Sequence, residues 1–214
     1  MDETAISNEG PRYEEAPWGD VLRDGFRFLL RGMKDTPAVV LSPSRDVLMW
    51  NPLGCALLAW HLTGLAELAT AQTAKGVASK ARDAGTRPNC ARMLFLDPRD
   101  RHLYPQWEHE TAREAAVLRQ AVERHPDDPA LAALIGELRD ADEYFASLWP
   151  RVAGRVRPFG VRKFLHPVVG PLELAYENIQ PHEPGPCILV FSAEPDSPSE
   201  RALRDLTDKA AAIR

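Results

Sequence analysis

The run closest to a catalytic or metal-binding motif is HETAR, residues 109–113. A helical zinc site needs a second histidine four residues after His109, and Arg113 occupies that position. The six histidines are scattered, and the three cysteines lie too far apart for a paired-cysteine metal motif. A Gly-x-Ser-x-Gly elbow, a phosphate loop and a Gly-x-Gly-x-x-Gly fingerprint are also missing from the sequence. We therefore expect no metal, no cofactor and no catalytic residue.

Large apolar side chains are the more informative feature. A set of aromatic residues is expected to turn inward: Trp50, Trp60, Trp107, Phe145, Trp149, Tyr176 and Phe191. Packed core is the simplest interpretation of each, but aromatic groups between a sheet and helices also line lipid-sized pockets. A fatty chain of about a dozen carbons would gain roughly 10 kcal/mol on burial, at about 0.8 kcal/mol per CH₂, whereas micromolar binding needs about 8 kcal/mol. A carboxylate head group would need a cation, for which the candidates are Arg92, Arg101, Arg162 and Lys163.

An antiparallel meander over residues 156–193 is the segment that must position these side chains. Three strand-like runs are expected at about 161–166, 172–178 and 187–193, separated by turns rich in Pro and Gly. The second run alternates apolar with polar residues, which predicts one wet face. The third run is almost wholly apolar, which predicts cover on both faces.

A hairpin and several helices precede the meander. Short apolar runs at 38–41 and 47–50 predict the hairpin. Asn51-Pro52, Asp97-Pro98 and Asp128-Pro129 predict helix starts, because the polar residue can cap and proline suits the first turn. A capping box from Ser197 to Glu200 predicts a last helix. Five antiparallel strands with a helical cover on one face make an α+β fold.

The chain ends are expected to be appendages of this domain. Residues 1–20 are polar and predicted to be a disordered tail, and a linker helix is expected over 21–35. The domain itself is expected over 36–196, followed by the C-terminal helix at 197–214. The linker helix carries an apolar stripe, Leu22, Phe26, Leu29, Leu30 and Met33. Such a stripe needs a partner surface, either its own domain or a second copy in a homodimer.

Composition excludes several classes of protein. The net charge of −5 argues against nucleic-acid binding by this chain, because phosphate binding needs a basic surface. No charged-then-apolar leader and no long apolar run occurs, so we expect neither secretion nor membrane insertion. Three cysteines without a disulfide pattern fit a reducing cytoplasm.

Several motifs taken together resemble a known family. In order, they are PAVVLSPSRDVLMWNPLGCALL, NCARMLFLDPRDRHLYPQWE, HPDDPALAALIGEL, KFLHPVVGPLELAYENI and LVFSAEPDSPSERAL, spanning about residues 36–206. Together they resemble the MmyB-like ligand-binding domain of bacterial, Xre-type helix-turn-helix transcription regulators. The resemblance implies a PAS-like five-stranded sheet, a sensor role and, for some members, a fatty acid as ligand. The family-like signature falls on Trp50, Asn51, Arg92, Phe95, Asp97, Tyr104, Trp107, His166, Gly170 and Tyr176.

Our main hypothesis is a ligand-sensing domain that binds a fatty-acid-like molecule between sheet and helices, without catalysis. Only about 35 residues precede the matching segment, too few for a helix-turn-helix domain, so we expect no DNA binding by this chain itself. The residues expected to bind ligand are Trp50, Arg92, Phe95, Tyr104, Trp107, Phe145, Trp149, His166, Leu174, Tyr176 and Val190.

Two other hypotheses stay open at this point. The chain could be an interaction module whose interior is filled by its own side chains and which dimerises through the N-terminal stripe. It could also be a hydrolase-type enzyme, with a site built from His166, Tyr176 and Arg92 because these polar groups are expected to face a cavity.

Overall fold

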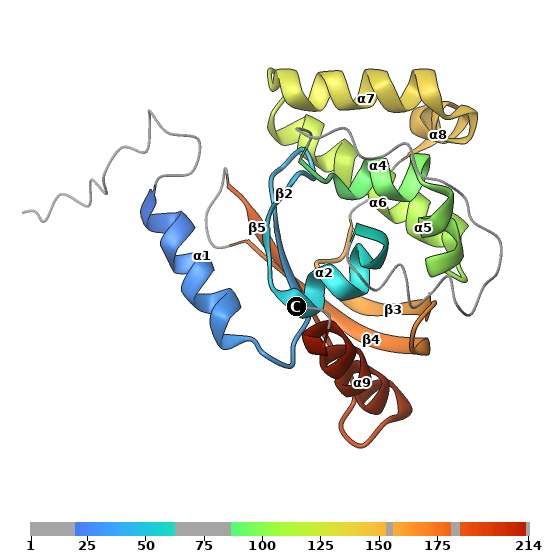
Figure 1. Ribbon diagram of the computed structural model, residues 1–214. Helices are drawn as coiled ribbons and strands as arrows, with labels where there is room; N and C mark the ends of the chain where they lie inside the picture. The colour runs from blue at the N-terminus through green and yellow to red at the C-terminus, as the bar shows by residue number, and fades with distance from the viewer. Residues whose placement is uncertain (1–19, 63–86, 153–155, 181–184, 213–214) are drawn as a thin grey trace, which may run out of the picture.

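A five-stranded antiparallel sheet forms the centre of the molecule (Figure 1). The computed structural model describes residues 20–62, 87–152, 156–180 and 185–212. The strands are β1 (Ala38–Leu41), β2 (Val47–Trp50), β3 (Phe159–His166), β4 (Gly170–Ile179) and β5 (Cys187–Ser192), in the spatial order β2-β1-β5-β4-β3. Because β1 pairs with β5, the hairpin and the meander join into one sheet, and the apolar β5 lies at its centre. The predicted α+β fold is confirmed.

Helices account for most of the remaining described residues. They are α1 (Asp20–Gly32), α2 (Pro52–Leu58), α4 (Cys90–Leu96), α5 (Pro98–Leu103), α6 (Trp107–Arg124), α7 (Pro129–Ala141), α8 (Glu143–Leu148) and α9 (Pro198–Ala212), with short 3₁₀ turns η1 (Trp60–Leu62) and η2 (Trp149–Arg151). The predicted Asx-Pro starts are confirmed, since the side chains of Asn51, Asp97 and Asp128 accept hydrogen bonds from backbone N–H groups in the first turns of α2, α5 and α7. These caps pair backbone N–H groups that the first turn of each helix would otherwise leave without a partner.

The helices are divided unequally between the two faces of the sheet. Helices α2, α4, α5, α6 and α9 lie on one face, called here the inner face, while α7 and α8 pack on α4 and α6 as a further layer (Figure 1). Helix α1 lies on the opposite, outer face, beside β1 and β5 (Figure 1). The sheet therefore has a thick cover on one side and a single helix over part of the other.

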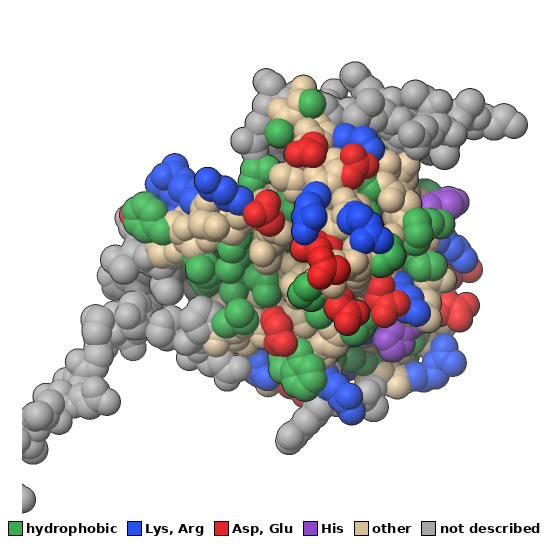
Figure 2. Space-filling model, turned by 90° about the horizontal axis from the view of Figure 1, so that it is seen from below, with side chains coloured by type: hydrophobic (Ala, Val, Ile, Leu, Met, Phe, Trp, Pro, Cys, Tyr) green, Lys and Arg blue, Asp and Glu red, His purple; other side chains and the backbone are tan. Residues whose placement is uncertain are grey.

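Alternation along β3 and β4 separates the two faces. Leu172, Leu174 and Tyr176 of β4 are buried on the inner face, as the sequence predicts. On the outer face of β3, Val161 and Leu165 are more than half exposed. The face that Figure 2 shows carries acidic and basic side chains interspersed with apolar ones, so this view contains no continuous basic surface.

Three buried clusters make up the core of the described residues. The first lies between the inner face of the sheet and α2, α5 and α9. The second lies among α4, α6, α7 and α8, away from the sheet. The third lies between α1 and the outer face of β1 and β5. Within the described residues, no helix combines the length and the apolar character needed to cross a membrane.

Candidate functional site

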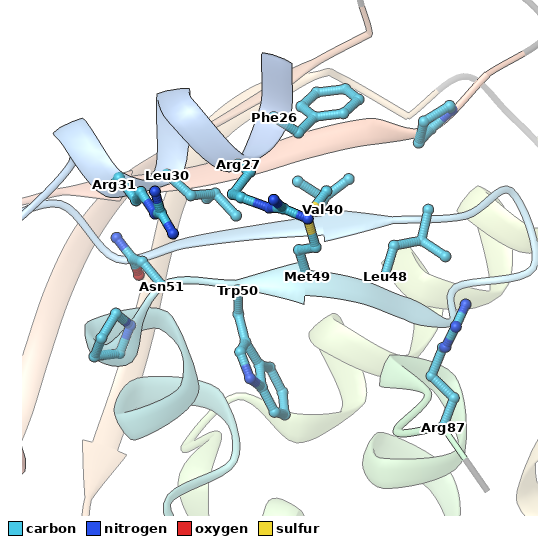
Figure 3. Close-up of a pocket in the computed structure, with 12 residues that line it drawn as sticks. Phe26, Arg27, Leu30, Arg31, Val40, Leu48, Met49, Trp50, Asn51 and Arg87 are labelled. Carbon is cyan, nitrogen blue, oxygen red and sulfur yellow. The ribbon is translucent and has the colours of Figure 1, made fainter. Parts of the chain in front are cut away.

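A groove of about 630 Å³ lies between α1 and the outer face of the β1–β2 hairpin (Figure 3). This volume falls within the roughly 300–1,000 Å³ typical of small-molecule sites. Its apolar wall consists of Phe26 and Leu30 from α1, Val40 from β1, and Leu48 and Met49 from β2. Local sequence explains the wall, because the helical stripe and the outward-facing hairpin residues meet here and form one apolar cluster.

Three arginines line this apolar groove. Arg27 and Arg31 lie one turn apart on α1, and Arg87 lies at the opposite end, beneath Leu48 (Figure 3). The Arg27 guanidinium extends over Met49 in this view and lies 3.4 Å from the exposed Asp24 carboxylate. Arg31 and Arg87 form no ion pair with any described residue, and both are exposed. The arrangement suits a molecule with an apolar body and an anionic end.

Asn51 connects the groove to the rest of the domain. Its side-chain NH₂ donates to the backbone oxygens of Met33 and Thr36, at 2.6 and 2.7 Å. Its Oδ1 accepts from the N–H groups of Ala38 and Gly54, at 3.1 and 2.7 Å. One buried amide thus joins the end of α1, the start of β1 and the first turn of α2. A ligand that displaces α1 would act directly on this junction.

The inner face contains buried charges beside a much smaller cavity, of about 20 Å³. Arg45 has the positive φ of 68° in the hairpin turn and its side chain enters the interior. There it donates from Nε and Nη2 to the Glu114 carboxylate, at 2.6 and 3.1 Å. Burial alone would lower the pKa of Arg45, but the Glu114 carboxylate outweighs it and raises that pKa. The hairpin turn is thereby fastened to α6.

The aromatic residues predicted to bind ligand lie mainly in solid core. Phe95, Phe145 and Trp149 belong to the cluster among α4, α6, α7 and α8 and contact one another there. Tyr104, Leu174 and Tyr176 are buried on the inner face of the sheet, with Trp107 half-buried beside them. Of these residues only Tyr104 lines the small inner cavity. Trp50 borders the groove beneath α1, but its side chain points away from α1 (Figure 3) and packs against the inner cluster, whereas Val190 packs against the apolar cluster beneath α1. The structure therefore does not bring the predicted set into one pocket.

The predicted polar site residues have structural partners. Arg92 lies at the surface and pairs with Glu137 on α7, at 2.7 Å, and its pKa is raised chiefly by that hydrogen-bonded carboxylate. His166 is buried, with Nε2 3.0 Å from the Ala56 carbonyl and Nδ1 3.3 Å from the Val168 N–H. Burial lowers the pKa of His166 to about 4, so the ring is neutral at pH 7. Neither residue is near Tyr176 in a shared cavity, so these three side chains do not form the catalytic set that the enzyme hypothesis requires.

The other titratable groups near the interior are also shielded. His61 lies 3.7 Å from Asp97 and 3.8 Å from Asp100, and burial lowers its pKa to about 4. Burial raises the pKa of the Cys90 thiol to about 12, which keeps it in the unreactive protonated form. Among the described residues there is no group of three or more His, Cys, Asp or Glu side chains suited to holding a metal ion.

Part of the N-terminal apolar stripe packs against the sheet of its own domain. Phe26 and Leu30 are buried against the outer face of the sheet, and Met33 is half-buried there. Leu29 points away and is 45% exposed, while the side chain of Leu22 lies outside the described residues. Residues 1–19, which contain most of the predicted tail, and residues 63–86 are likewise outside them.

Sequence reasoning missed the groove arginines, although a signal for two of them was present. Arg27 and Arg31 are four residues apart and flank the apolar stripe, so a helix places them on one side of it. Arg45 and Glu114 are 69 positions apart, and no local pattern links them. Of the candidate head-group cations, Arg162 alone is buried in the interior; Arg101 and Lys163 are exposed and Arg92 is half-buried.

The fold and the groove are those of an α+β domain with a ligand-sized site on its sheet. A family model for the MmyB-like transcription regulator ligand binding domain matches residues 22–206. The chain belongs to this family. A search of curated proteins finds no match to the sequence. The family is regulatory, and ligand binding is the role its description assigns to this domain.

Proposed function

We propose that the chain is the ligand-sensing part of a transcription regulator and binds an apolar acid of fatty-acid type in the groove beneath α1. The observation that carries the proposal is the groove itself, an apolar space of about 630 Å³ with arginines along its lining. The inner cavity, of about 20 Å³, is far too small for such a molecule. The family supports the regulatory part of the proposal.

Energetics fit a ligand of this kind. Each buried CH₂ contributes about 0.8 kcal/mol, so a dozen carbons contribute roughly 10 kcal/mol before the costs of association. The apolar wall supplies this term, and Arg27 or Arg31 supplies the preference for an acid over a neutral head group. The protein acts by binding and by changing position, without catalysis, in the cytoplasm where a transcription regulator meets the chromosome.

The response to ligand passes through α1. This helix forms one wall of the groove, and it is the part of the described chain that leads towards the N-terminus. A bound chain wedged between α1 and the hairpin would stretch or shift the Asn51 junction, because Met33 and Ala38 are both held by that amide. A change in the position of α1 relative to the sheet would then report that ligand is bound.

A fluorescent fatty acid, cis-parinaric acid, tests the proposal on delipidated full-length protein. Wild type is expected to bind with a micromolar Kd. Leu48→Trp should fill the groove and weaken binding at least tenfold. The double variant Arg27→Gln/Arg31→Gln should lose the preference for myristic acid over tetradecanol as a competitor.

Arg204→Gln on the exposed face of α9 is the matched control, and it should bind as wild type does. Circular dichroism and Tm establish that each variant is folded. Absence of saturable binding by wild type, or unchanged binding by Leu48→Trp, would refute the proposed site.

A dimerisation module is the second candidate function, and one observation favours it. Phe28 and Leu29 lie on the side of α1 away from the sheet and are 66% and 45% exposed. Light scattering on wild type and on Phe28→Glu/Leu29→Glu decides it. A dimer that becomes a monomer in the variant supports this function, whereas a monomeric wild type eliminates it.

A further inference from the structure

The inner cavity is surrounded by charged side chains whose pairing is incomplete. It is lined by Arg45, Arg113 and Arg162 together with Glu110 and Glu114, and by the carboxyl group of Asp100. Arg162 lies on the inner face of β3 and is 4% exposed. The N–H donors of an arginine buried to this extent normally all find acceptors, because an unpaired buried charge is costly.

Arg162 does not satisfy its donors with protein groups among the described residues. Its Nε lies 3.1 Å from Glu110 Oε2, as an ion pair without hydrogen-bond geometry. Nε and Nη2 both lack a hydrogen-bond acceptor. Arg113 donates to the same Glu110 oxygen from Nε and Nη2, at 3.1 and 2.8 Å, so Glu110 is committed to Arg113.

The Arg162 guanidinium lies over two aromatic rings. Its central carbon lies 5.1 Å from the ring centre of Tyr176 and 5.4 Å from that of Phe191. The open donors, Nε and Nη2, lie together on one edge of the planar group, which is the geometry that accepts an anion side-on. The cavity adjoins this buried group, so the donors do not face bulk solvent.

Three arginines and three carboxyl groups line the cavity, so the protonation state of Asp100 decides its charge balance. Three arginines face two glutamates, and the Arg45–Glu114 pair is complete by itself. Asp100 does not supply the missing charge readily, because burial and the nearby Asp97 carboxylate raise its pKa well above the usual range. Among the described residues, Asp100 lies within ion-pair distance of His61 and Arg162 within that of Glu110, and the two do not pair with each other.

From this geometry we infer that the inner cavity is a binding site for one small monovalent anion, of chloride size, held by the Nε–Nη2 edge of Arg162. The cavity of about 20 Å³ has room for one atom-sized occupant, since a single water probe needs about 10–15 Å³. A fatty-acid carboxylate with its chain does not fit. The site is therefore separate from the groove beneath α1, and it would stand even if the groove bound nothing.

Thermal unfolding of the full chain in different sodium salts at equal ionic strength tests this inference. Chloride and bromide should raise the Tm relative to gluconate, by about 4 °C at ten times the dissociation constant. Gluconate is too large for the cavity and supplies the baseline. Arg162→Gln should abolish the difference between salts, while Arg204→Gln should retain it.

Crystals grown in sodium bromide provide a measurement that does not depend on a variant folding. An anomalous peak beside Arg162 Nε and Nη2 is expected in the wild-type protein. A water at that position without anomalous signal, or equal Tm values in chloride and gluconate, would overturn the inference.

Discussion

The two faces of the sheet differ in what covers them and in how well they are filled. Five helices lie on the inner face, where buried side chains leave a cavity of about 20 Å³ among charged groups. One helix covers part of the outer face and leaves a groove of about 630 Å³. A single helix cannot follow the whole width of a twisted sheet, so space persists along its edge. The larger of these two spaces therefore lies on the face with the thinner cover.

Breaking the inner ion pair should have the largest effect on stability. Glu114→Ala leaves the 5%-exposed Arg45 without its carboxylate, and should lower the free energy of unfolding by about 3–5 kcal/mol. Glu137→Ala, which removes the partially exposed partner of Arg92, should cost less than about 1 kcal/mol. Urea unfolding measures both. Equal effects would show that the buried pair is no more important than the surface pair.

Truncation of a core aromatic should separate stability from binding. Phe145 lies on α8 and is fully buried against Phe95 of α4, so Phe145→Ala should cost about 3–5 kcal/mol. Parinaric acid binding should nevertheless stay within about twofold of wild type at a temperature where the variant is folded, because this residue is far from the groove lining. Loss of binding by a folded Phe145→Ala would place the ligand among the helices instead.

The Asn51 junction should couple the two faces. Asn51→Ala removes four hydrogen bonds and should cost about 2–3 kcal/mol. Asp128→Ala, which removes only the cap of α7, should cost about 1 kcal/mol. Amide exchange in α1 should accelerate in Asn51→Ala and stay unchanged in Asp128→Ala. Unchanged amide exchange in both variants would contradict the claim that the Asn51 hydrogen bonds hold α1 in place.

Lowering the pH should reduce the free energy of unfolding, because His166 on the inner face is buried in its neutral form. Burial depresses its pKa to about 4 in the folded protein, whereas the unfolded chain titrates near 6.5, so the unfolded state binds more protons between these values. The stabilisation is complete above pH 6.5 and declines as the pH falls towards 4. His166 alone should account for about 2 kcal/mol between pH 7 and pH 5.

Urea unfolding at the two pH values measures this loss, and His166→Gln should reduce it while retaining a donor for the Ala56 carbonyl. His61, whose pKa is also about 4, adds a similar term in both proteins. An equal loss of stability in wild type and variant would contradict the role assigned to His166.

Local patterns predicted the elements of the fold well. Proline after an Asx cap marked three helix starts, and alternation in β4 identified the buried face. The capping box differed in one detail, because Glu200 accepts from the N–H of Asp196 and not from that of Ser197. These features depend on residues a few positions apart, which is why sequence alone reveals them.

The candidate site depends on contacts that no local pattern encodes. Phe145 and Leu174 are similarly apolar in the sequence, yet packing assigns them to different clusters. The groove exists because α1 turns back onto the outer face, a placement decided by the stripe around Phe26 and by the Asn51 amide. Arg45 faces Glu114 only after the hairpin packs on α6.

Photo-crosslinking with a fatty acid that carries a diazirine near the end of its chain tests the central claim most directly. After irradiation of the full-length protein, peptide mapping should place the label in α1 around Phe26–Leu30 and in β2 around Leu48–Met49. Unlabelled myristic acid should compete for that label, and Leu48→Trp should remove it. Saturable labelling of the helices that carry Phe145 and Trp149, with none beneath α1, would contradict the account.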